Sequence, residues 1–514
     1  MRNFTLNRKI VFRYFYLFLV GLFLAFSQAN AQSVIYVDVN ASGNNNGSSW
    51  TDAYVGLQDA LNNSGAGDTL WVAQGTYKPT SNTDRTIYFE IPDGVAVYGG
   101  FSGSETQLSE RDYENNQTIL SGDIGVVNDS TDNSYHVVYF YNVSSNTRMD
   151  GFIVTGGHTG FFMPQGEEPD PSLFSDTLAG GGIVNVAEGG SERSDPAIAN
   201  CLITGNTGML GAGFCNYTDA GTTGPSIKKC MFSNNNGAIG GGLNNFVFNN
   251  GLCETVIDSC QFNGNKAEMV SGGGMSSMSM GGESSPVLKY CFFKNNIANE
   301  GGGFAVSAMK VNAQAGSANP ELYYCRFSEN LASEDGGGII SNVSYDSQIE
   351  LTMDSCEFEY NKAYEEGGGM DFDADSAGNA TLHMTQCTFT GDSAVSADWA
   401  GGGGMSIYAG TDGVIQAHLD SCQFESTYAS DAGGGIRLYS DSAATASLDL
   451  SNCLFHNNRV DSASGGGLYS SSNATGVNNL TMTNCMFDNN EAGHTGGGVF
   501  SSSDNAEISP VITG

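Results

Sequence analysis

Basic residues and proline are both scarce in this sequence. It has 19 lysines and arginines against 55 aspartates and glutamates, so its formal net charge is −36. This surplus of negative charge makes nucleic acids and anionic membrane surfaces poor partners. Only 10 prolines accompany 70 glycines, and the glycines recur at regular intervals between apolar residues. The composition is therefore not that of a disordered tail.

Cysteine is absent before Cys201, and long apolar runs are absent after the first 31 residues. Those residues hold four basic side chains, an apolar core (17–26) and small residues at their end, the layout of a cleavable secretory signal. We expect residues 1–31 to be removed and the mature chain to start at Gln32. The alternative is a membrane anchor, but the uncharged apolar stretch of about 13 residues is short for a span.

Cleavage would leave 15 basic and 55 acidic residues, a net charge of −40. We expect a protein that is secreted or held at the outer cell surface and that does not span a membrane. The missing early cysteine excludes lipidation directly after the signal.

Ten cysteines recur about every 31 residues and mark an internal repeat. They are Cys201, Cys230, Cys260, Cys291, Cys325, Cys356, Cys387, Cys422, Cys453 and Cys485. Two residues later stands a phenylalanine in every repeat but the first, which has Ile203. Three residues further on, eight repeats have asparagine, and Asp392 and Thr427 replace it in the others. A glycine triplet and an apolar residue, such as Gly336–Ile339, separate successive motifs.

This repeat predicts an all-β fold, a right-handed single-stranded parallel β-helix with coils of about 31 residues. Residues two apart in a strand share a face, so the cysteine and the phenylalanine point inward together. Parallel stacking of coils about 4.8 Å apart places cysteine on cysteine and phenylalanine on phenylalanine. The asparagine then forms an amide ladder at an inward turn. The glycines supply turns with positive φ or allow coils to approach closely, and the rest of each repeat forms a third short strand.

A leucine-rich repeat is the alternative, because Met353-x-x-Cys356-x-Phe358-x-x-Asn361 imitates its core motif. That architecture needs a helical segment after each strand. Here glycine, serine and β-compatible residues follow instead, which favours the β-helix.

The chain divides into an amino-terminal part and a regular part. Residues 32–150 should form a cap and irregular first coils, with strands at 34–39 and 69–73 and a short capping helix at 57–61. Residues 151–514 should form regular coils, interrupted by an inserted loop near 160–174 that is rich in proline, glycine and glutamate. The sequence stops inside an expected strand, so we expect a carboxy-terminal cap or anchor domain that this chain does not contain.

Four stretches resemble the start of secreted bacterial right-handed β-helix proteins of the pectate-lyase-like or choice-of-anchor type. They are Ile35–Pro79, Val95–Gly103 (VAVYGGFSG), Thr118–Ile124 (TILSGDI) and Met149–Gly157 (MDGFIVTGG). The repeats are also similar to those of bacterial polymorphic outer membrane proteins, which combine GGA-apolar with F-x-x-N. The resemblance implies the fold and export to the cell surface. It is less specific for function, because this fold carries polysaccharide lyases, glycoside hydrolases and adhesins alike.

The periodic cysteines should be a core stripe of mostly free thiols. A metal site would need thiolates at much closer spacing, and parallel register holds neighbouring Cβ atoms beyond disulfide distance. Cys215 and Cys253 lie outside the stripe and could pair across adjacent coils.

The strand that contains Asp371, Asp373 and Asp375 is the best candidate site, because these carboxylates should point outward while the residues between them point inward. Register from the glycine triplets places further polar side chains on the same face. The predicted ligand-binding residues are Asn342, Asp371, Asp373, Asp375, Tyr408 and Tyr439, and the catalytic candidates, if the chain is an enzyme, are Asp371, Asp373 and Arg437. A solvated sheet face is the plainer interpretation.

Acidic residues directly before the glycine triplets suggest calcium as the one possible cofactor. Stacked turns would hold their like charges a few ångströms apart, which is unfavourable without a cation or water. The predicted calcium residues are Glu334, Asp335, Glu365 and Glu366, with Glu300, Asp398 and Asp431 at related positions. The six histidines form no recurring pair.

We therefore expect a monomeric, non-catalytic β-helix protein of the cell surface or medium that serves adhesion, matrix binding or glycan binding. Its partner would be an extracellular glycan or another surface molecule. The alternative is a polysaccharide lyase or glycoside hydrolase that acts on extracellular polysaccharide.

Overall fold

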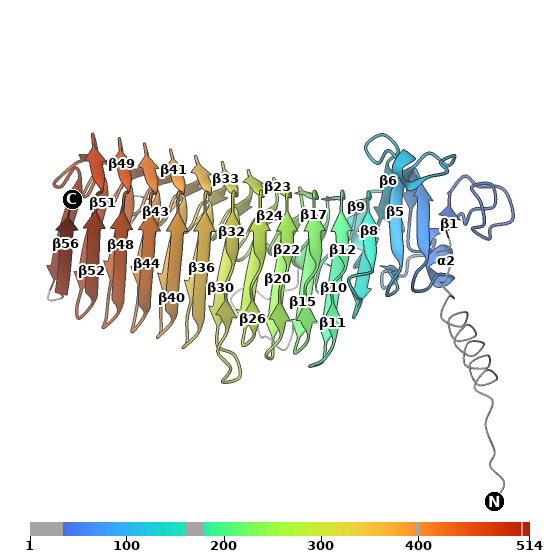
Figure 1. Ribbon diagram of the computed structural model, residues 1–514, viewed down its shortest axis with the longest axis horizontal. Coiled ribbons are helices and arrows are strands. Elements are labelled where there is room, and N and C mark those ends of the chain that lie inside the picture. Colours follow the sequence, from blue (N-terminus) through green and yellow to red (C-terminus); the bar gives the residue numbers. More distant parts are fainter. Residues whose placement is uncertain (1–33, 160–178, 397–399, 505–506, 514) are drawn as a thin grey trace, which may run out of the picture.

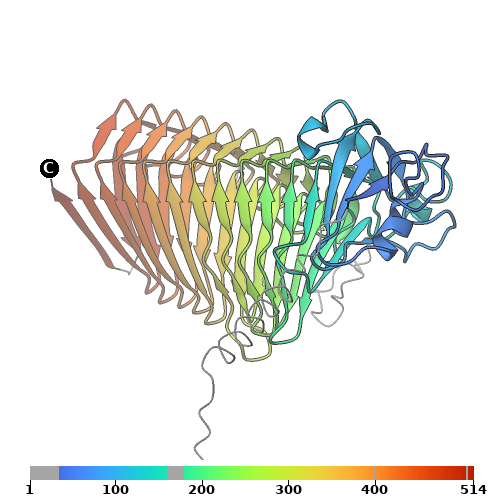
Figure 2. The same ribbon diagram turned by 45° about the vertical axis from the view of Figure 1, so that its right-hand side comes forward.

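The chain forms a right-handed parallel β-helix of about 14 turns, as predicted. The computed structural model describes residues 34–159, 179–396, 400–504 and 507–513. Strands make up 49% of the structure and helices 3%. Coils of about 31 residues stack along the long axis, with the amino-terminal coils at one end and β56 (Glu507–Thr513) at the other (Figures 1 and 2). The predicted signal, 1–31, and the predicted loop, 160–174, lie outside the described residues.

Four parallel sheets, here called A to D, contain 20, 13, 13 and 10 of the described strands. Sheet A includes β17 (Ser226–Lys228), β22 (Val256–Asp258), β27 (Val287–Lys289), β32 (Glu321–Tyr323), β36 (Gln348–Asp354), β40 (Asn379–Thr385), β44 (Val414–Asp420), β48 (Thr445–Ser451) and β52 (Val477–Thr483). Sheet B follows the cysteine and includes β18 (Met231–Ser233), β23 (Gln261–Asn263), β28 (Phe292–Lys294), β33 (Arg326–Ser328), β37 (Glu357–Glu359), β45 (Gln423–Glu425), β49 (Leu454–His456) and β53 (Met486–Asp488).

Sheet C follows the glycine triplets. It includes β30 (Phe304–Met309), β35 (Ile339–Val343), β39 (Met370–Ala374), β43 (Met405–Ala409), β47 (Ile436–Ser440) and β51 (Leu468–Asn473). Sheet D was not predicted. Its strands are short, such as β34 (Leu331–Ala332) and β38 (Lys362–Ala363). Two residues after most ladder positions stands an alanine that points inward, such as Ala332 or Ala363, and that stacks on its counterpart in the next coil.

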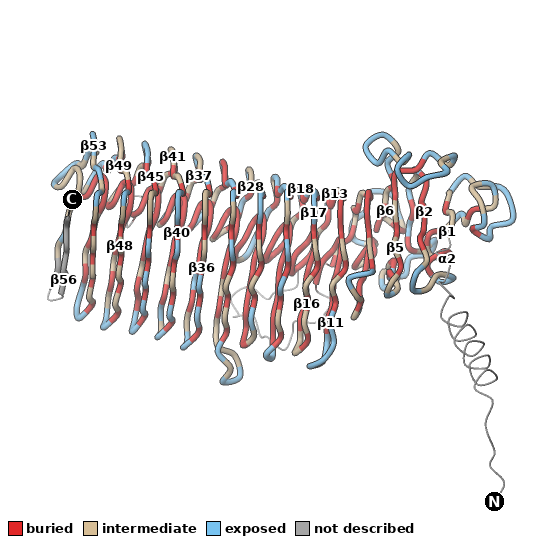
Figure 3. Tube along the Cα trace, in the orientation of Figure 1, coloured by how far each residue is buried: buried red, intermediate tan, exposed pale blue. Residues whose placement is uncertain are grey.

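The cysteine and phenylalanine columns fill the interior, as predicted. Successive phenylalanine rings from Phe232 to Phe487 lie parallel with centroids 4.4–5.0 Å apart. Figure 3 shows buried positions alternating with intermediate or exposed ones along the strands of sheet A, such as β40 and β48. All twelve cysteines are free thiols, so Cys215 and Cys253 are not paired.

The asparagine ladder is also confirmed. Asn296 Nδ2 donates to Asn330 Oδ1 at 2.9 Å, and Asn330 Nδ2 donates to Asn361 Oδ1 at 2.9 Å. Each amide also donates to the carbonyl of a phenylalanine in an earlier coil. Inward asparagines are thus satisfied by their counterparts, which keeps buried polar groups from destabilising the core.

The glycine triplets serve both predicted purposes. The first glycine of a triplet has positive φ, +67° at Gly336 and +62° at Gly367. The third glycine lies against the next coil: a Cβ atom at Gly338 would stand 2.5 Å from the carbonyl oxygen of Gly369. A side chain at this position would therefore force the coils apart.

The amino-terminal end agrees with its predicted elements. β1 (Val34–Val37) pairs in parallel with β2 (Thr69–Ala73), and α2 (Leu57–Asn62) buries Leu57, Ala60 and Leu61 in the core at this end of the helix. Among the described residues, no helix has both the length and the apolar character needed to cross a membrane.

Candidate functional site

The predicted catalytic residues, and the predicted ligand-binding residues other than Asp375, lie on the outer face of sheet C in the predicted register, and Asp375 directly follows β39. Asp371 of β39, Ser406 of β43 and Arg437 of β47 form one column across three coils. Asn342, Asp373, Tyr408 and Tyr439 form the next column, read from β35 to β47. The spacing of the glycine triplets was therefore sufficient to predict which residues of different coils lie side by side.

The expected solvent exposure of the carboxylates is wrong for Asp371. Its side chain points away from the core, yet only 1% of the residue is exposed, and Arg437 is 7% exposed. A turn before a glycine triplet folds over the first outward-pointing residue of the strand in the next coil. Gly401 in one such turn lies so close to Arg437 that a Cβ atom would stand 2.1 Å from Arg437 Cδ. The alternation of inward and outward residues along a strand does not predict that a turn covers part of the outer face.

A buried ion pair crosses the column. The guanidinium of Arg437 pairs with Glu366, and Ser406 Oγ donates to the same glutamate oxygen, Oε2, at 2.7 Å. Burial lowers the pKa of Arg437, but the neighbouring carboxylates of Glu366 and Asp371 outweigh it and leave this pKa raised. We call this group, with Asp335, Asp371 and Asp373, the carboxylate cluster.

The remaining carboxylates of the cluster favour their neutral forms. Burial, and after it the charge of Asp373, raises the pKa of Asp371 well above its usual value. Burial and the charge of Glu366 do the same for Asp373. Oδ1 of each aspartate is buried without a hydrogen-bond partner. Burial raises the pKa of Asp335 to about 7, although the backbone N–H of Glu366 donates to its Oδ1 at 2.7 Å.

The four predicted calcium residues do not converge on one point. Glu334 and Glu365 are exposed, whereas Asp335 and Glu366 are half-buried. Within the described ranges, no group of three or more histidine, cysteine, aspartate or glutamate side chains is placed to hold a metal ion. Calcium binding remains a prediction, and Asp398 lies outside the described residues.

The other predicted ligand-binding residues are more accessible. Asn342 and Asp375 are exposed, and the half-buried rings of Tyr408 and Tyr439 stack with centroids 5.8 Å apart. The guanidinium carbon of Arg437 lies 4.9 Å from the centre of the Tyr439 ring.

A second surface, which the sequence analysis missed, lies at the edge where sheet A turns into sheet B. The residue before each periodic cysteine occupies this turn with positive φ; these residues include Asn200, Lys229, Ser259, Tyr290, Tyr324 and Ser355. The exposed rings of Tyr290 (60%) and Tyr324 (52%) stack with centroids 5.1 Å apart and planes 7° apart. We call this pair and its flanking residues the tyrosine edge.

Polar groups flank both ends of the tyrosine stack. In the turn ladder, Ser259 precedes Tyr290 and Ser355 follows Tyr324. Each serine hydroxyl donates to the aspartate before it, Asp258 or Asp354, at 2.9 Å. Because serine is short, the outer face of each tyrosine ring has no bulky ladder neighbour.

Basic residues flank the stack in sequence: Lys289 directly precedes Tyr290, and Arg326 follows Tyr324 by two residues. The ammonium of Lys289 lies 5.4 Å from the centre of the Tyr323 ring, and the guanidinium of Arg326 lies 5.4 Å from the centre of the Phe292 ring. Two coils before Tyr290, the edge borders an open hollow of about 440 Å³ lined by Tyr113, Asn200, Lys229 and Met231, among other residues. The edge thus combines aromatic surface, charge and a concavity.

The sequence signal for this edge is a tyrosine directly before the cysteine in two successive repeats, Tyr290-Cys291 and Tyr324-Cys325. The other periodic cysteines follow asparagine, lysine, serine or glutamine.

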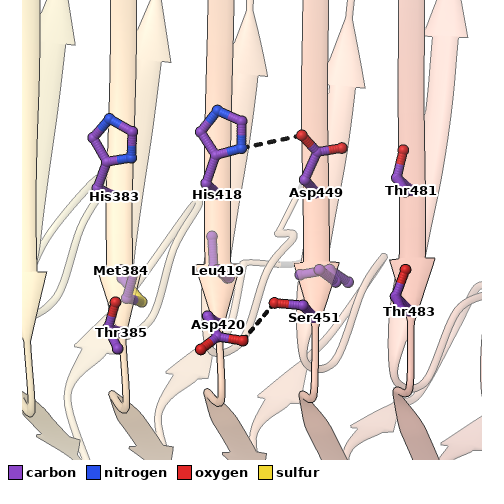
Figure 4. Close-up of a pocket in the computed structure, with 11 residues that line it drawn as sticks. His383, Met384, Thr385, His418, Leu419, Asp420, Asp449, Ser451, Thr481 and Thr483 are labelled. Atoms are coloured by element: carbon purple, nitrogen blue, oxygen red, sulfur yellow. Dashed lines mark hydrogen bonds and ion pairs between the residues drawn. The ribbon is translucent and has the colours of Figure 1, made fainter.

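Two of the six histidines meet in the fold, which the sequence analysis did not predict. His383 of β40 and His418 of β44 are direct ladder partners on the outer face of sheet A, in the hollow shown in Figure 4. The spacing of 35 residues between them equals that between Cys387 and Cys422, which was the available signal.

Comparison with models of known protein families gives no match, and comparison with curated proteins gives none either. The fold agrees with the resemblance to pectate-lyase-like and polymorphic outer membrane proteins, but membership of either family stays a prediction.

Proposed function

We propose that this chain is a non-catalytic β-helix protein of the cell surface or extracellular medium that binds glycans along the tyrosine edge. The observation that carries the proposal is the exposed stack of Tyr290 and Tyr324. Tyrosine with positive φ is uncommon and costs conformational energy. The turn imposes positive φ on the residue before every periodic cysteine, so the unexpected feature is tyrosine in place of the asparagine or serine of most other coils, which favours a binding role for the two rings.

The chemistry of the edge suits a sugar. Binding sites for small ligands combine apolar or aromatic surface with a few placed polar groups. The outer faces of the two rings offer apolar surface to the C–H groups of a sugar ring. Asp258 and Asp354 offer acceptors for its hydroxyls, and Lys289 and Arg326 offer donors. A linear glycan along the coil axis would lie across both rings, which belong to successive coils.

Export and surface location rest on the predicted signal in 1–31 and on the resemblance to secreted pectate-lyase-like and polymorphic outer membrane proteins. The resemblance also supports an extracellular partner. Independently, the formal charge disfavours nucleic acid as a partner.

The alternative is a polysaccharide lyase or glycoside hydrolase that uses the carboxylate cluster. The convergence of Asp371, Asp373 and Arg437, with raised carboxylate pKa values, favours it, because perturbed pKa values gather at catalytic sites. Burial opposes it. At 1% and 7% exposure, Asp371 and Arg437 could not contact a glycan unless the covering turn moved.

Retention of the purified mature chain on a panel of immobilised acidic and neutral polysaccharides, with and without Ca²⁺, tests the proposal. We expect retention on at least one polysaccharide and at least tenfold weaker binding by a Tyr290→Ser, Tyr324→Ser double variant. Serine already occupies this turn position at Ser259 and Ser355, so the double variant should fold.

The matched control is Tyr345→Ser. Tyr345 is also 60% exposed with positive φ, but it lies at the edge between sheets C and A. This variant should bind like the wild type. Equal binding by the double variant, or no retention on any polysaccharide, would contradict the proposal.

A further inference from the structure

Two imidazole rings lie side by side on the outer face of sheet A. His383 and His418 occupy the same position in neighbouring strands, and their ring centroids are 5.4 Å apart with planes 11° apart. Figure 4 shows the rings in the same orientation, so that corresponding nitrogens of the two rings lie next to each other. Both side chains are nearly half exposed, at 45% and 46%.

Carboxylates surround the pair. His418 Nδ1 lies 3.0 Å from Asp449 Oδ2 on the next strand, β48, and His383 Nε2 lies 4.0 Å from Glu350 Oε1 on the previous strand, β36. Asp420 and Asp449 also line the hollow of about 260 Å³ that contains both rings. The hollow is therefore rich in negative charge and in groups that accept a cation.

The contact with Asp449 determines which ring nitrogen of His418 carries the proton. A carboxylate next to Nδ1 favours the proton on that nitrogen, which leaves the lone pair on Nε2. Metal-binding histidines almost always donate their other ring N–H to such a partner, which orients the ring and increases its basicity. The exposed end of His418 is thus prepared as a ligand, with His383 beside it.

From this geometry we propose that His383 and His418 bind one divalent transition metal ion, with Zn²⁺ and Cu²⁺ as the ions that imidazole suits. Nitrogen-to-zinc bonds are about 2.0–2.1 Å long, so the rings must tilt toward each other, which their exposure permits. Two protein ligands leave the remaining positions to water. This agrees with the finding that the described residues contain no site with three ligands already in place.

The chain offers a matched control in His456. His456 Nδ1 lies 3.1 Å from Asp488 Oδ2 on the neighbouring strand, so it has the same carboxylate contact as His418. Its ladder neighbours are Glu425 and Asp488, and neither is a histidine. A single carboxylate-bound histidine on this fold can therefore be compared with the pair.

Calorimetric titration of the full mature chain, purified without a histidine tag, with Zn²⁺ tests the proposal. We expect one ion per chain, with affinity reduced at least tenfold by His383→Ala and by His418→Ala. Asp449→Asn should weaken binding about tenfold, the lower end of the effect of removing such a carboxylate partner. His456→Ala should bind like the wild type.

Paramagnetic resonance of the Cu²⁺ form should show two nitrogen ligands in the wild type and in His456→Ala, and fewer in either variant of the pair. The proposal is overturned if the His383→Ala, His418→Ala double variant binds Zn²⁺ as tightly as the wild type. It is equally overturned if His456→Ala loses as much affinity as the variants of the pair.

Discussion

Arg437 pairs with Glu366 across two coils of the β-helix, past Ser406, which donates to the same glutamate oxygen. Glu366 belongs to the turn before its glycine triplet, and only 8% of the Arg437 side chain and 20% of the Glu366 side chain are exposed. Removal of one partner of a buried ion pair leaves the other charge uncompensated. We predict that Arg437→Met destabilises the fold by about 3–5 kcal/mol, measured by urea unfolding.

The control for this prediction is the Arg437→Met, Glu366→Gln double variant, which leaves no unpaired charge. It should recover a large part of the lost stability. If the single and double variants unfold at the same urea concentration, the ion pair does not have the proposed role.

The carboxylate cluster predicts a fold that weakens as the pH rises. Asp335 has a folded-state pKa of about 7 against an ordinary value of 3.8. Its neutral form is favoured by the fold, so its contribution is fully present below about pH 4 and is lost as the pH rises through about 7. The loss is as much as about 4 kcal/mol for a shift of this size.

Urea unfolding of the wild type at pH 5 and pH 8 measures this dependence. Asp335→Asn retains the acceptor for the Glu366 N–H and should reduce the difference between the two pH values. Asp375→Asn, at an exposed position, should leave it unchanged. A wild type that is more stable at pH 8 than at pH 5 would contradict the assignment.

The asparagine ladder contains one imperfect member, Asp392. Its Oδ1 accepts from the backbone N–H and the amide of Asn361, at 2.7 and 2.8 Å, but Oδ2 is buried without a partner. Burial also raises the pKa of Asp392 well above its usual value. We predict that Asp392→Asn stabilises the fold by about 1 kcal/mol or more, because its amide would donate to the Phe358 carbonyl as other ladder amides do.

Thermal unfolding at neutral pH checks the Asp392→Asn prediction. Asn361→Ala, which removes a satisfied member of the same ladder, should instead cost about 1–3 kcal/mol. A lower melting temperature for Asp392→Asn than for the wild type would show that the buried oxygen is satisfied in some other way.

We predict that substitutions at the tyrosine edge weaken glycan binding without destabilising the fold. Asparagine tolerates positive φ better than tyrosine, and it occupies the same turn at Asn200 and Asn452. Tyr290→Asn and Tyr324→Asn should therefore unfold at the same temperature as the wild type or slightly above it, while glycan retention falls. A clear loss of stability in either variant would indicate a structural role for the stack.

The repeat was sufficient to predict the fold because the residues that stack on one another are separated by a nearly constant number of residues. Each cysteine, phenylalanine and asparagine meets its counterpart about one repeat away, and the register of Asp373 with Tyr408 followed from the same spacing. The burial of Asp371 could not be predicted in this way, because it depends on how the turns before the glycine triplets fold across neighbouring coils. Sheet D escaped prediction because two-residue strands have almost no periodic signal.

The tyrosine edge and the histidine pair were missed for a different reason. Tyr290 and Tyr324 interrupt a position that is otherwise polar, and His383 and His418 match the local spacing of 35 residues rather than the average of the repeat. Departures from the repeat at a fixed distance from each cysteine were therefore the informative signal.

Incubation of the purified mature chain with the polysaccharide panel, with and without Ca²⁺, tests the central claim that it binds glycans without cleaving them. Unsaturated products absorbing at 235 nm and new reducing ends are read together with retention. The account predicts retention on at least one polysaccharide and no product from any. Product release above that of an Asp371→Ala, Asp373→Ala double variant would contradict it and would make this chain an enzyme.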